Sequence, residues 1–303
     1  MARRNVLPPD LADLVPSWRV ELKALNRSPS TERVYLTGVR RYLAWLAAHD
    51  RPPVLTRPLV TEWVADTMTA GASPASAATW LAGVRQYSKW LAREGELLTD
   101  PLVGMSSPKS DVPVTPVLSE DDLKRLIKAC QGQRLKDRRD EAAIRLMVET
   151  GMRIGECCAL DVADVDVVGM TAVIRRGKGG RGRTVPFGPA TARTLDRYLR
   201  IRKHHHAADT AGLWLGEYRT GRISSHGMRD ALEARADDAG LAGFHPHVLR
   251  HTFASRWMSA RGSEGGLMQV AGWRDRAMLD RYAAITANTR AHDEARKLNL
   301  GDY

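Results

Sequence analysis

The chain has 303 residues, of which 43% are hydrophobic and 27% are charged. That length accommodates two domains with at least one sizeable core, and that balance excludes an intrinsically disordered protein. No apolar run approaches the roughly 20 residues of a membrane span, and no apolar stretch follows the basic N-terminus as in a secretory signal. The formal net charge of +11 favours a polyanionic partner, either a nucleic acid or a membrane surface.

The basic side chains are mostly arginine, with 37 arginines against 9 lysines. Arginine binds two phosphate oxygens at once, whereas lysine acts as a point charge, so this bias favours phosphate recognition. A GC-rich genome produces the same bias, and the sequence leaves both explanations open. The three cysteines are Cys130 and the adjacent Cys157 and Cys158, a poor arrangement for a disulfide. They predict small buried thiols and a reducing cytoplasm.

Helical patterns fill the first third of the chain. Ser28, Thr56 and Ser73 each precede a proline by one or two positions, which is typical of a helix N-terminus. Gly95 is placed to end the last helix. Apolar side chains recur between these signals at helical spacing, as in Tyr35, Val39, Tyr42 and Leu46, and again in Leu81, Val84 and Leu91 together with Ser88. The pattern predicts a compact bundle of about four helices.

Residues 99–120 interrupt this pattern. They contain four prolines and Gly104 among serines and threonines, which predicts an extended linker. We therefore expect two domains, a helical one over residues 1–111 and a second one over residues 112–303.

The second domain is predicted to be helical around a small sheet. Ser119 and Asp122 have the spacing of a capping box, and a longer helix over about 137–150 should end at Gly151 and be followed by a short one. Over residues 165–187, β-branched segments separated by glycines predict a small antiparallel sheet. Helices then return to the end, with a short strand expected near Trp214. The fold class is mostly α with a small antiparallel β-sheet.

The segment HPHVLRHT, residues 245–252, contains three histidines around Arg250. On a helix, His247, Arg250 and His251 share one face. The two histidines have zinc-ligand spacing, but no third ligand lies nearby and the arginine would repel a cation. A phosphate site and an ordinary helix start with a packed histidine remain as the two readings.

Three further segments combine charge with tight turns. In ETGMRIGE, residues 149–156, glycines flank Arg153 and Glu156 can hold its guanidinium; a surface salt bridge is the plain alternative. In RRGKGGRGRTVPF, residues 175–187, Lys178 lies on a glycine-rich turn, where it could donate a proton or merely be solvated. In AGWRDRAMLDRYAAI, residues 271–285, Trp273 precedes Tyr282, which by itself would be a packing residue.

These four segments, in this order, resemble the boxes of the tyrosine recombinase (phage integrase) family. TGMRIGE resembles the first arginine box, GKGGRGRTVP the hairpin lysine box, HPHVLRHTFAS the His-x-x-Arg box and AGWRDRAMLDRY the nucleophile box. The resemblance covers most of the chain. It implies an N-terminal helical, SAM-like core-binding domain that clamps DNA and an α+β catalytic domain. Trp273 departs from the histidine of most members and is similar to the tryptophan of Cre recombinase.

The resemblance also implies a role for each residue in cutting and rejoining DNA through a 3′-phosphotyrosine. The catalytic set is Arg153, Lys178, His247, Arg250, Trp273 and Tyr282, as phosphate clamp, general acid, proton-transfer residue, second clamp, hydrogen-bond donor and nucleophile. Glu156 would orient Arg153, and His251 would support the same site. The tryptophan indole donates a hydrogen bond but does not titrate.

The partners implied are double-stranded DNA with paired core sites and a homotetramer assembled on it, with no membrane, cofactor or metal. The protein would be bacterial or phage-encoded, cytoplasmic and associated with the nucleoid or a mobile element. The need for an accessory directionality factor stays open. Two rival functions share these residues: DNA relaxation by a type-IB topoisomerase, and DNA binding by a regulator that does not use Tyr282.

Overall fold

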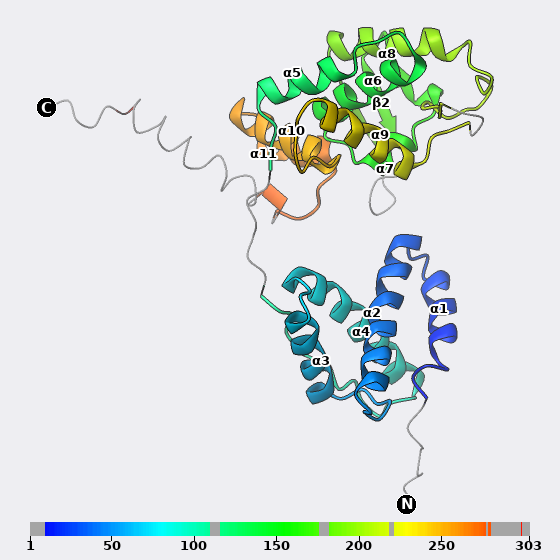
Figure 1. The fold of residues 1–303 in the computed structure, drawn as a ribbon, viewed down its shortest axis with the longest axis vertical. Coiled ribbons are helices and arrows are strands. Elements are labelled where there is room, and N and C mark those ends of the chain that lie inside the picture. Colours follow the sequence, from blue (N-terminus) through cyan, green and yellow to red (C-terminus); the bar gives the residue numbers. More distant parts are fainter. Residues whose placement is uncertain are drawn as a thin grey trace, which may run out of the picture. The chain divides into compact units, whose positions relative to one another are not determined.

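The computed structural model describes residues 10–109, 116–175, 182–217 and 221–276, together with 278, 279 and 298. The chain divides into two compact units, which Figure 1 shows as ribbons and which we describe separately. The N-terminal unit spans Met1–Val112 and the C-terminal unit Pro113–Tyr303. Within the described residues, no helix combines the length and the apolar character needed to cross a membrane.

Four helices build the N-terminal unit: α1 Val15–Ala24, α2 Pro29–Ala48, α3 Arg57–Thr69 and α4 Pro74–Glu94. The three predicted starts are confirmed, because the side chains of Ser28, Thr56 and Ser73 each accept a backbone N–H from the first turn of their helix. Gly95 ends α4 in the left-handed conformation, at φ +81°. Local sequence signals therefore set the limits of α2, α3 and α4.

Two glycines set the distance between α2 and α4, which the sequence did not predict. A Cβ on Gly38 would lie 2.2 Å from the backbone oxygen of Trp80, and a Cβ on Gly83 would lie 2.6 Å from that of Tyr35. Each helix therefore places a glycine against the backbone of the other. The apolar faces around this crossing form the core of the unit, including Trp18, Val39, Tyr42, Leu46, Leu81, Val84 and Leu91.

The stretch predicted as a linker is partly folded. Leu102 is buried in the core of the N-terminal unit, and the Ser88 hydroxyl donates to the Asp100 carboxylate at 2.5 Å. The expectation of an extended segment was therefore wrong for its beginning, because one apolar side chain and one carboxylate find partners on α4.

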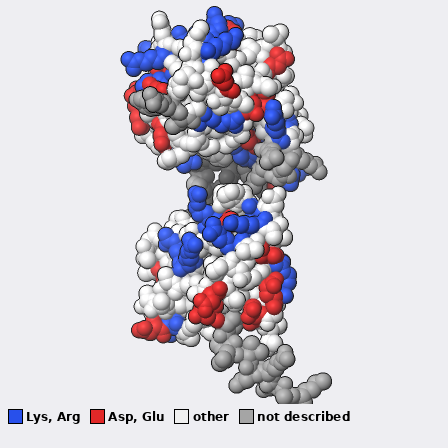
Figure 2. All heavy atoms as spheres, turned by 90° about the vertical axis from the view of Figure 1, so that its right-hand side faces the viewer, with Lys and Arg blue, Asp and Glu red and all other residues white. Residues whose placement is uncertain are grey.

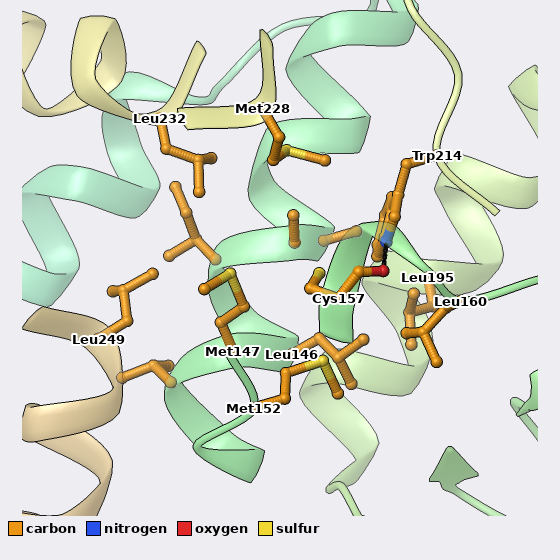
Figure 3. Close-up of a cluster of buried hydrophobic side chains, with 14 of the residues drawn as sticks. Leu146, Met147, Met152, Cys157, Leu160, Leu195, Trp214, Met228, Leu232 and Leu249 are labelled. Carbon is orange, nitrogen blue, oxygen red and sulfur yellow. Dashed lines mark hydrogen bonds between the residues drawn. The ribbon is translucent and has the colours of Figure 1, made fainter. Parts of the chain in front are cut away.

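Six helices in the described part of the C-terminal unit surround a long central one. The helices are α5 Glu120–Ala129, α6 Leu135–Thr150, α7 Ile154–Cys158, α8 Pro189–Arg202, α9 Ser225–Asp238, α10 His247–Ser259 and α11 Glu264–Ala271. The central helix is α6, whose Leu146 and Met147 lie inside the cluster drawn in Figure 3 with Met228 and Leu249 from other helices. The Trp214 indole donates to the Cys157 carbonyl oxygen at 2.9 Å in the same cluster.

A three-stranded antiparallel sheet lies beside these helices. Its strands, β1 Val165–Asp166, β2 Thr171–Ile174 and β3 Arg183–Pro186, follow the order β1-β2-β3, with Ile174 opposite Arg183. A short 3-10 turn, η1 Val162–Asp164, leads into β1. The predicted fold class is therefore confirmed. The strand expected near Trp214 was wrong: Gly212 bridges to Asp161 and Leu215 bridges to Arg222, so the backbone pairs with two separate segments and forms no continuous ladder with either.

Candidate active site

The first arginine box forms the turn between α6 and α7. Gly151 ends α6 at φ +63°, and a Cβ there would lie 2.3 Å from the Phe253 ring. Only glycine satisfies both the left-handed backbone and the contact with α10. The turn leaves Arg153 at the N-terminus of α7, with its side chain 28% exposed and therefore accessible to a ligand.

Glu156 connects this turn to the sheet. Its side chain is only 5% exposed, and it accepts from the Arg153 guanidinium at 2.8 Å and from the Arg153 backbone N–H at 3.0 Å. Arg183, the first residue of β3, donates to both oxygens of the same carboxylate, at 2.8 and 3.3 Å. One buried carboxylate therefore fixes two guanidinium groups from different elements.

Two opposed influences set the charge of Glu156. Burial raises the pKa of its carboxyl, but the hydrogen bonds and positive charges of Arg183 and Arg153 outweigh burial and hold the pKa below its ordinary value of 4.5. The carboxylate is therefore ionised at neutral pH and offsets part of the charge of the two arginines.

Arg250 connects the first box to the last. It lies on α10 and is 1% exposed, and its guanidinium donates to the Gly151 carbonyl oxygen at 2.5 Å and to the Ala271 carbonyl oxygen at 2.8 Å. Both carbonyls lie two residues before a predicted site residue, Arg153 in one case and Trp273 in the other.

Arg183 closes a ring of contacts. Its Nε donates to the Val270 carbonyl oxygen at 2.8 Å, and a Cβ on Gly272 would lie 3.0 Å from its guanidinium. The ring runs from the α6–α7 turn through Glu156, β3, the end of α11 and Arg250, and returns to the turn. Segments more than 100 residues apart in sequence are thereby held around one place in the C-terminal unit.

The remaining described residues of the predicted site lie beside this ring. The Arg250 guanidinium carbon is 5.4 Å from the centre of the Trp273 ring, and Trp273 is buried at the end of α11. The rings of His247 and His251 meet edge to face on α10, with centres 4.6 Å apart, His247 being exposed and His251 buried. These two histidines therefore contact each other on the helix that carries Arg250.

The structure thus brings together Arg153, Glu156, Arg250 and Trp273 through the contacts above and keeps His247 and His251 next to Arg250. Lys178 and Tyr282 lie outside the described residues. His245 is exposed in the turn before α10. Across the described ranges, no group of three His, Cys, Asp or Glu side chains has an arrangement that could hold a metal ion.

Arg183 was missed by the sequence analysis. It is one of five basic residues in RRGKGGRGRTVPF, and nothing in the spacing distinguishes it from the other four. Its importance comes from the register of the sheet, which places it opposite Ile174 and within reach of the buried Glu156.

The chain matches two known protein families. Residues 116–289 match the phage integrase family, and residues 18–95 match the phage integrase N-terminal SAM-like domain. The tyrosine recombinase XerC of Pseudomonas aeruginosa is 30% identical over 221 residues, which cover 69% of this chain and 70% of that protein. XerC of Oceanobacillus iheyensis is 29% identical over 201 residues, and the match covers 64% of this chain and 65% of that protein, slightly less than two thirds of its length.

A crystal structure of a lambda integrase tetramer bound to a Holliday junction has the same fold, with a TM-score of 0.68 at 17% identity, over 88% of this chain and 77% of that one. The family match alone covers more than half of the chain and contains every described residue of the candidate site. The chain therefore belongs to the phage integrase family, the tyrosine recombinases.

Proposed function

We propose that this protein is a site-specific DNA recombinase that cuts and rejoins DNA through a 3′-phosphotyrosyl intermediate, as a tetramer on two core sites. The observation that carries the proposal is the ring of contacts through Glu156, Arg183 and Arg250, because it joins residues of all four family boxes around one place: Gly151 and Glu156, Arg183, Arg250 and Ala271. Integration, excision or resolution of a mobile element in a bacterial cytoplasm would all use this reaction.

The phosphate is activated by Arg153 and Arg250. A DNA phosphodiester is negatively charged and resists attack by an oxygen nucleophile. Arg153 and Arg250 offset the charge that develops on the non-bridging oxygens in the transition state. Glu156 and His251 position these groups, because Glu156 holds Arg153 at 2.8 Å and His251 lies next to Arg250 on α10.

Proton and bond changes are assigned to four further residues. Tyr282 attacks the phosphorus and forms the 3′-phosphotyrosine, while His247 assists the proton transfer from its phenol. Lys178 gives a proton to the 5′ oxygen as the bond to phosphorus breaks. Trp273 donates a hydrogen bond to a phosphate oxygen. The phosphotyrosine conserves the energy of the broken bond, so that a second strand can be joined without ATP.

Nonspecific DNA binding is assigned to the arginines and lysines on the surface of both units. Figure 2 shows these side chains gathered on part of the surface of the N-terminal unit, while acidic side chains gather elsewhere on it. Each phosphate contact releases counterions, so the affinity for DNA should fall steeply as salt rises. The tetramer is proposed by analogy with the lambda integrase tetramer bound to a Holliday junction, which has the same fold.

A nicked suicide substrate tests the proposal. Such a DNA loses the short 5′-hydroxyl strand after cleavage and traps the covalent adduct, which migrates slowly in a denaturing gel. The wild-type protein should form the adduct, and Tyr282→Phe should form none while still binding DNA. If both proteins form no adduct at any core site from the DNA flanking the gene, the protein is a DNA-binding regulator.

Strand exchange separates the recombinase from a topoisomerase. A plasmid with two core sites should be converted into two circles. Relaxation of supercoiled DNA that lacks core sites, without any exchange between sites, would identify a type-IB topoisomerase instead.

A further inference from the structure

Two arginines flank the segment that joins β2 to β3, and each is bound to a buried carboxylate. Arg183 begins β3 and is held by Glu156, as described above. Arg175 follows the last residue of β2, and its Nε donates to the Asp164 Oδ1 at 2.5 Å. Glu156 and Asp164 are 5% and 4% exposed. The proposed general acid, Lys178, lies in the sequence between these two arginines.

Each carboxylate oxygen of Asp164 accepts a different hydrogen bond. While Oδ1 accepts from Arg175, Oδ2 accepts from the Asp161 backbone N–H at 2.8 Å and caps η1. The turn that Asp164 caps leads directly into β1, which pairs with β2. Asp164 therefore fixes Arg175 to a rigid part of the unit rather than to another surface side chain.

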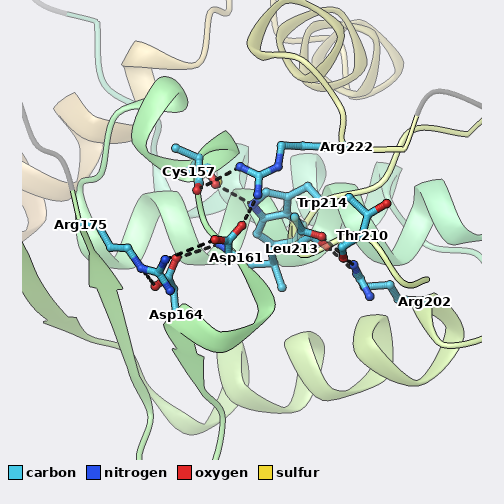
Figure 4. Close-up of polar contacts among 11 residues, drawn as sticks. Cys157, Asp161, Asp164, Arg175, Arg202, Thr210, Leu213, Trp214 and Arg222 are labelled. Carbon is cyan, nitrogen blue, oxygen red and sulfur yellow. Dashed lines mark hydrogen bonds and ion pairs between the residues drawn. The ribbon is translucent and has the colours of Figure 1, made fainter. Parts of the chain in front are cut away.

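Asp161 extends this network, which Figure 4 shows with its ion pairs. Its carboxylate lies 3.4 Å from the Arg175 Nη1 and also pairs with Arg222, which belongs to a different segment. A pocket of about 450 Å³ is lined in part by Glu156, Asp164 and Arg175. The side chain of Arg175 is 58% exposed, so its orientation depends on these carboxylates and not on packing.

We propose that Asp164 and Arg175 are positioning residues for Lys178 in DNA cleavage. The inference rests on the proposed function, in which Lys178 is the proton donor. Three residues of chain span at most about 11 Å, so fixing Arg175 restricts the region that Lys178 reaches. A proton donor is effective only within hydrogen-bond distance of its acceptor. The second anchor, Arg183 on Glu156, fixes the other strand to the residue that holds Arg153.

The step concerned is the departure of the 5′ oxygen. The Tyr282 oxygen forms a bond to phosphorus, the bond from phosphorus to the 5′ oxygen breaks with its electron pair going to that oxygen, and the Lys178 ammonium supplies the proton. If the 5′ bridging oxygen is replaced by sulfur, a thiolate leaves instead. Because a thiol has a pKa of about 8.5, the thiolate leaves without a proton. The sulfur substrate therefore bypasses Lys178 and everything that acts through it.

The experiment measures adduct formation under saturating protein on two suicide substrates that differ only in this bridging atom. Arg175→Ala and Asp164→Asn should each slow cleavage of the oxygen substrate by about tenfold, part of the 10²- to 10⁴-fold contribution of a positioned proton donor. Cleavage of the sulfur substrate should change by less than about threefold. The matched control is Arg222→Gln, which removes an arginine from the same network but lies outside the hairpin, and its sulfur-to-oxygen rate ratio should equal that of the wild type.

Lys178→Ala calibrates the assay. It should raise the sulfur-to-oxygen rate ratio more than either anchor variant does. If it does so and neither anchor variant raises the ratio, the positioning role is wrong and the recombinase function stands. If Arg175→Ala slows both substrates equally, Arg175 is a DNA contact and the positioning role is again wrong.

Two other results would overturn more than the positioning role. If the wild type cleaves neither substrate, the proposed function fails. If Lys178→Ala leaves the sulfur-to-oxygen rate ratio unchanged, the role of Lys178 fails together with this inference.

Discussion

The two units bury different kinds of side chain. Among the described residues, the N-terminal unit buries no charged side chain, and apart from Ser88 and the hydroxyls of Tyr42 and Tyr87 its core is apolar. In the C-terminal unit the buried residues include eight charged ones: Asp137, Arg139, Asp140, Glu141, Glu156, Asp164, Arg202 and Arg250. Apolar packing therefore dominates the core of the first unit, whereas the second unit also contains buried ion pairs between distant segments.

The buried charges of the C-terminal unit join segments that lie far apart in the sequence. Burying a charge is costly unless it is paired and hydrogen-bonded, so an apolar core would be the simpler solution. In the C-terminal unit, Arg235 on α9 binds Asp137 and Asp140 on α6 at 2.7 and 3.0 Å, and Glu156 binds Arg153 and Arg183. Such pairs fix the direction as well as the distance between the groups that they join, which contacts between apolar side chains do not.

The largest expected effect follows from removing the charge of Glu156. Glu156→Gln leaves Arg183, which is 7% exposed, without its ionic partner, so the C-terminal unit should lose about 3 kcal/mol of unfolding free energy. Urea unfolding measures this loss. Adduct formation should also fall, because Arg153 loses the group that orients it.

A surface pair in the N-terminal unit is the matched control. Arg51 and Glu62 form an ion pair in which both side chains are more than 40% exposed. Glu62→Gln should therefore cost less than about 1 kcal/mol. A loss equal to that of Glu156→Gln would contradict the view that burial distinguishes the two units.

The second largest effect is expected at the crossing of α2 and α4. Gly38→Ala places a methyl group 2.2 Å from the Trp80 carbonyl oxygen, so the N-terminal unit should lose about 2 kcal/mol. All three cysteines are buried in the C-terminal unit, so their rate of reaction with a thiol reagent reports on that unit alone. This rate should be the same in Gly38→Ala as in the wild type. Gly265→Ala, a helical position with open space around the new Cβ, is the control and should not destabilise the protein.

A smaller effect is expected at a helix start in the N-terminal unit. Ser73 accepts the Ser76 backbone N–H at 3.2 Å, so Ser73→Ala should cost about 1 kcal/mol. Ser73→Asn keeps an acceptor at the cap and should retain most of the stability. Thermal unfolding of the two variants measures the difference, and equal melting temperatures would exclude a contribution from the cap.

The smallest effect is expected in the pH dependence of stability, because burial and the arginines oppose each other at Glu156. The folded pKa lies below the ordinary value of 4.5, so the unfolded chain takes up the proton first as pH falls. The ionised carboxylate therefore contributes fully above 4.5, and this contribution is lost as pH falls through the folded pKa. The difference in stability between wild type and Glu156→Gln should be constant between about pH 6 and 8 and shrink at more acidic pH.

Local signals explain how much of the fold could be predicted. The caps at Ser28, Thr56, Ser73 and Ser119 form because each needs only the backbone of its own first turn. The strand expected near Trp214 failed because its backbone makes bridges to two separate segments instead of a ladder with one. The start of the predicted linker failed for a similar reason, since Leu102 is buried by helices that the local sequence does not specify.

The residues of the candidate site likewise include some that the sequence predicted and others that it did not. Arg153, Glu156, Arg250 and Trp273 were predicted because they stand in segments whose order and spacing are typical of one family. Arg183, Arg175 and Asp164 were not predicted, because their roles arise from the sheet register and from carboxylates on another element. No spacing along the chain distinguishes them from other charged residues.

By itself, the sequence determined where several helices begin or end, the small sheet and the motifs that are typical of the family, because these depend on neighbours within a few positions or on short segments. Only the tertiary structure decided which arginines meet which carboxylates and carbonyls. The reason is physical: a buried ion pair or hydrogen bond forms between groups that folding brings within about 3 Å, and the carbonyl partners of Arg250 lie 99 and 21 residues away in the chain.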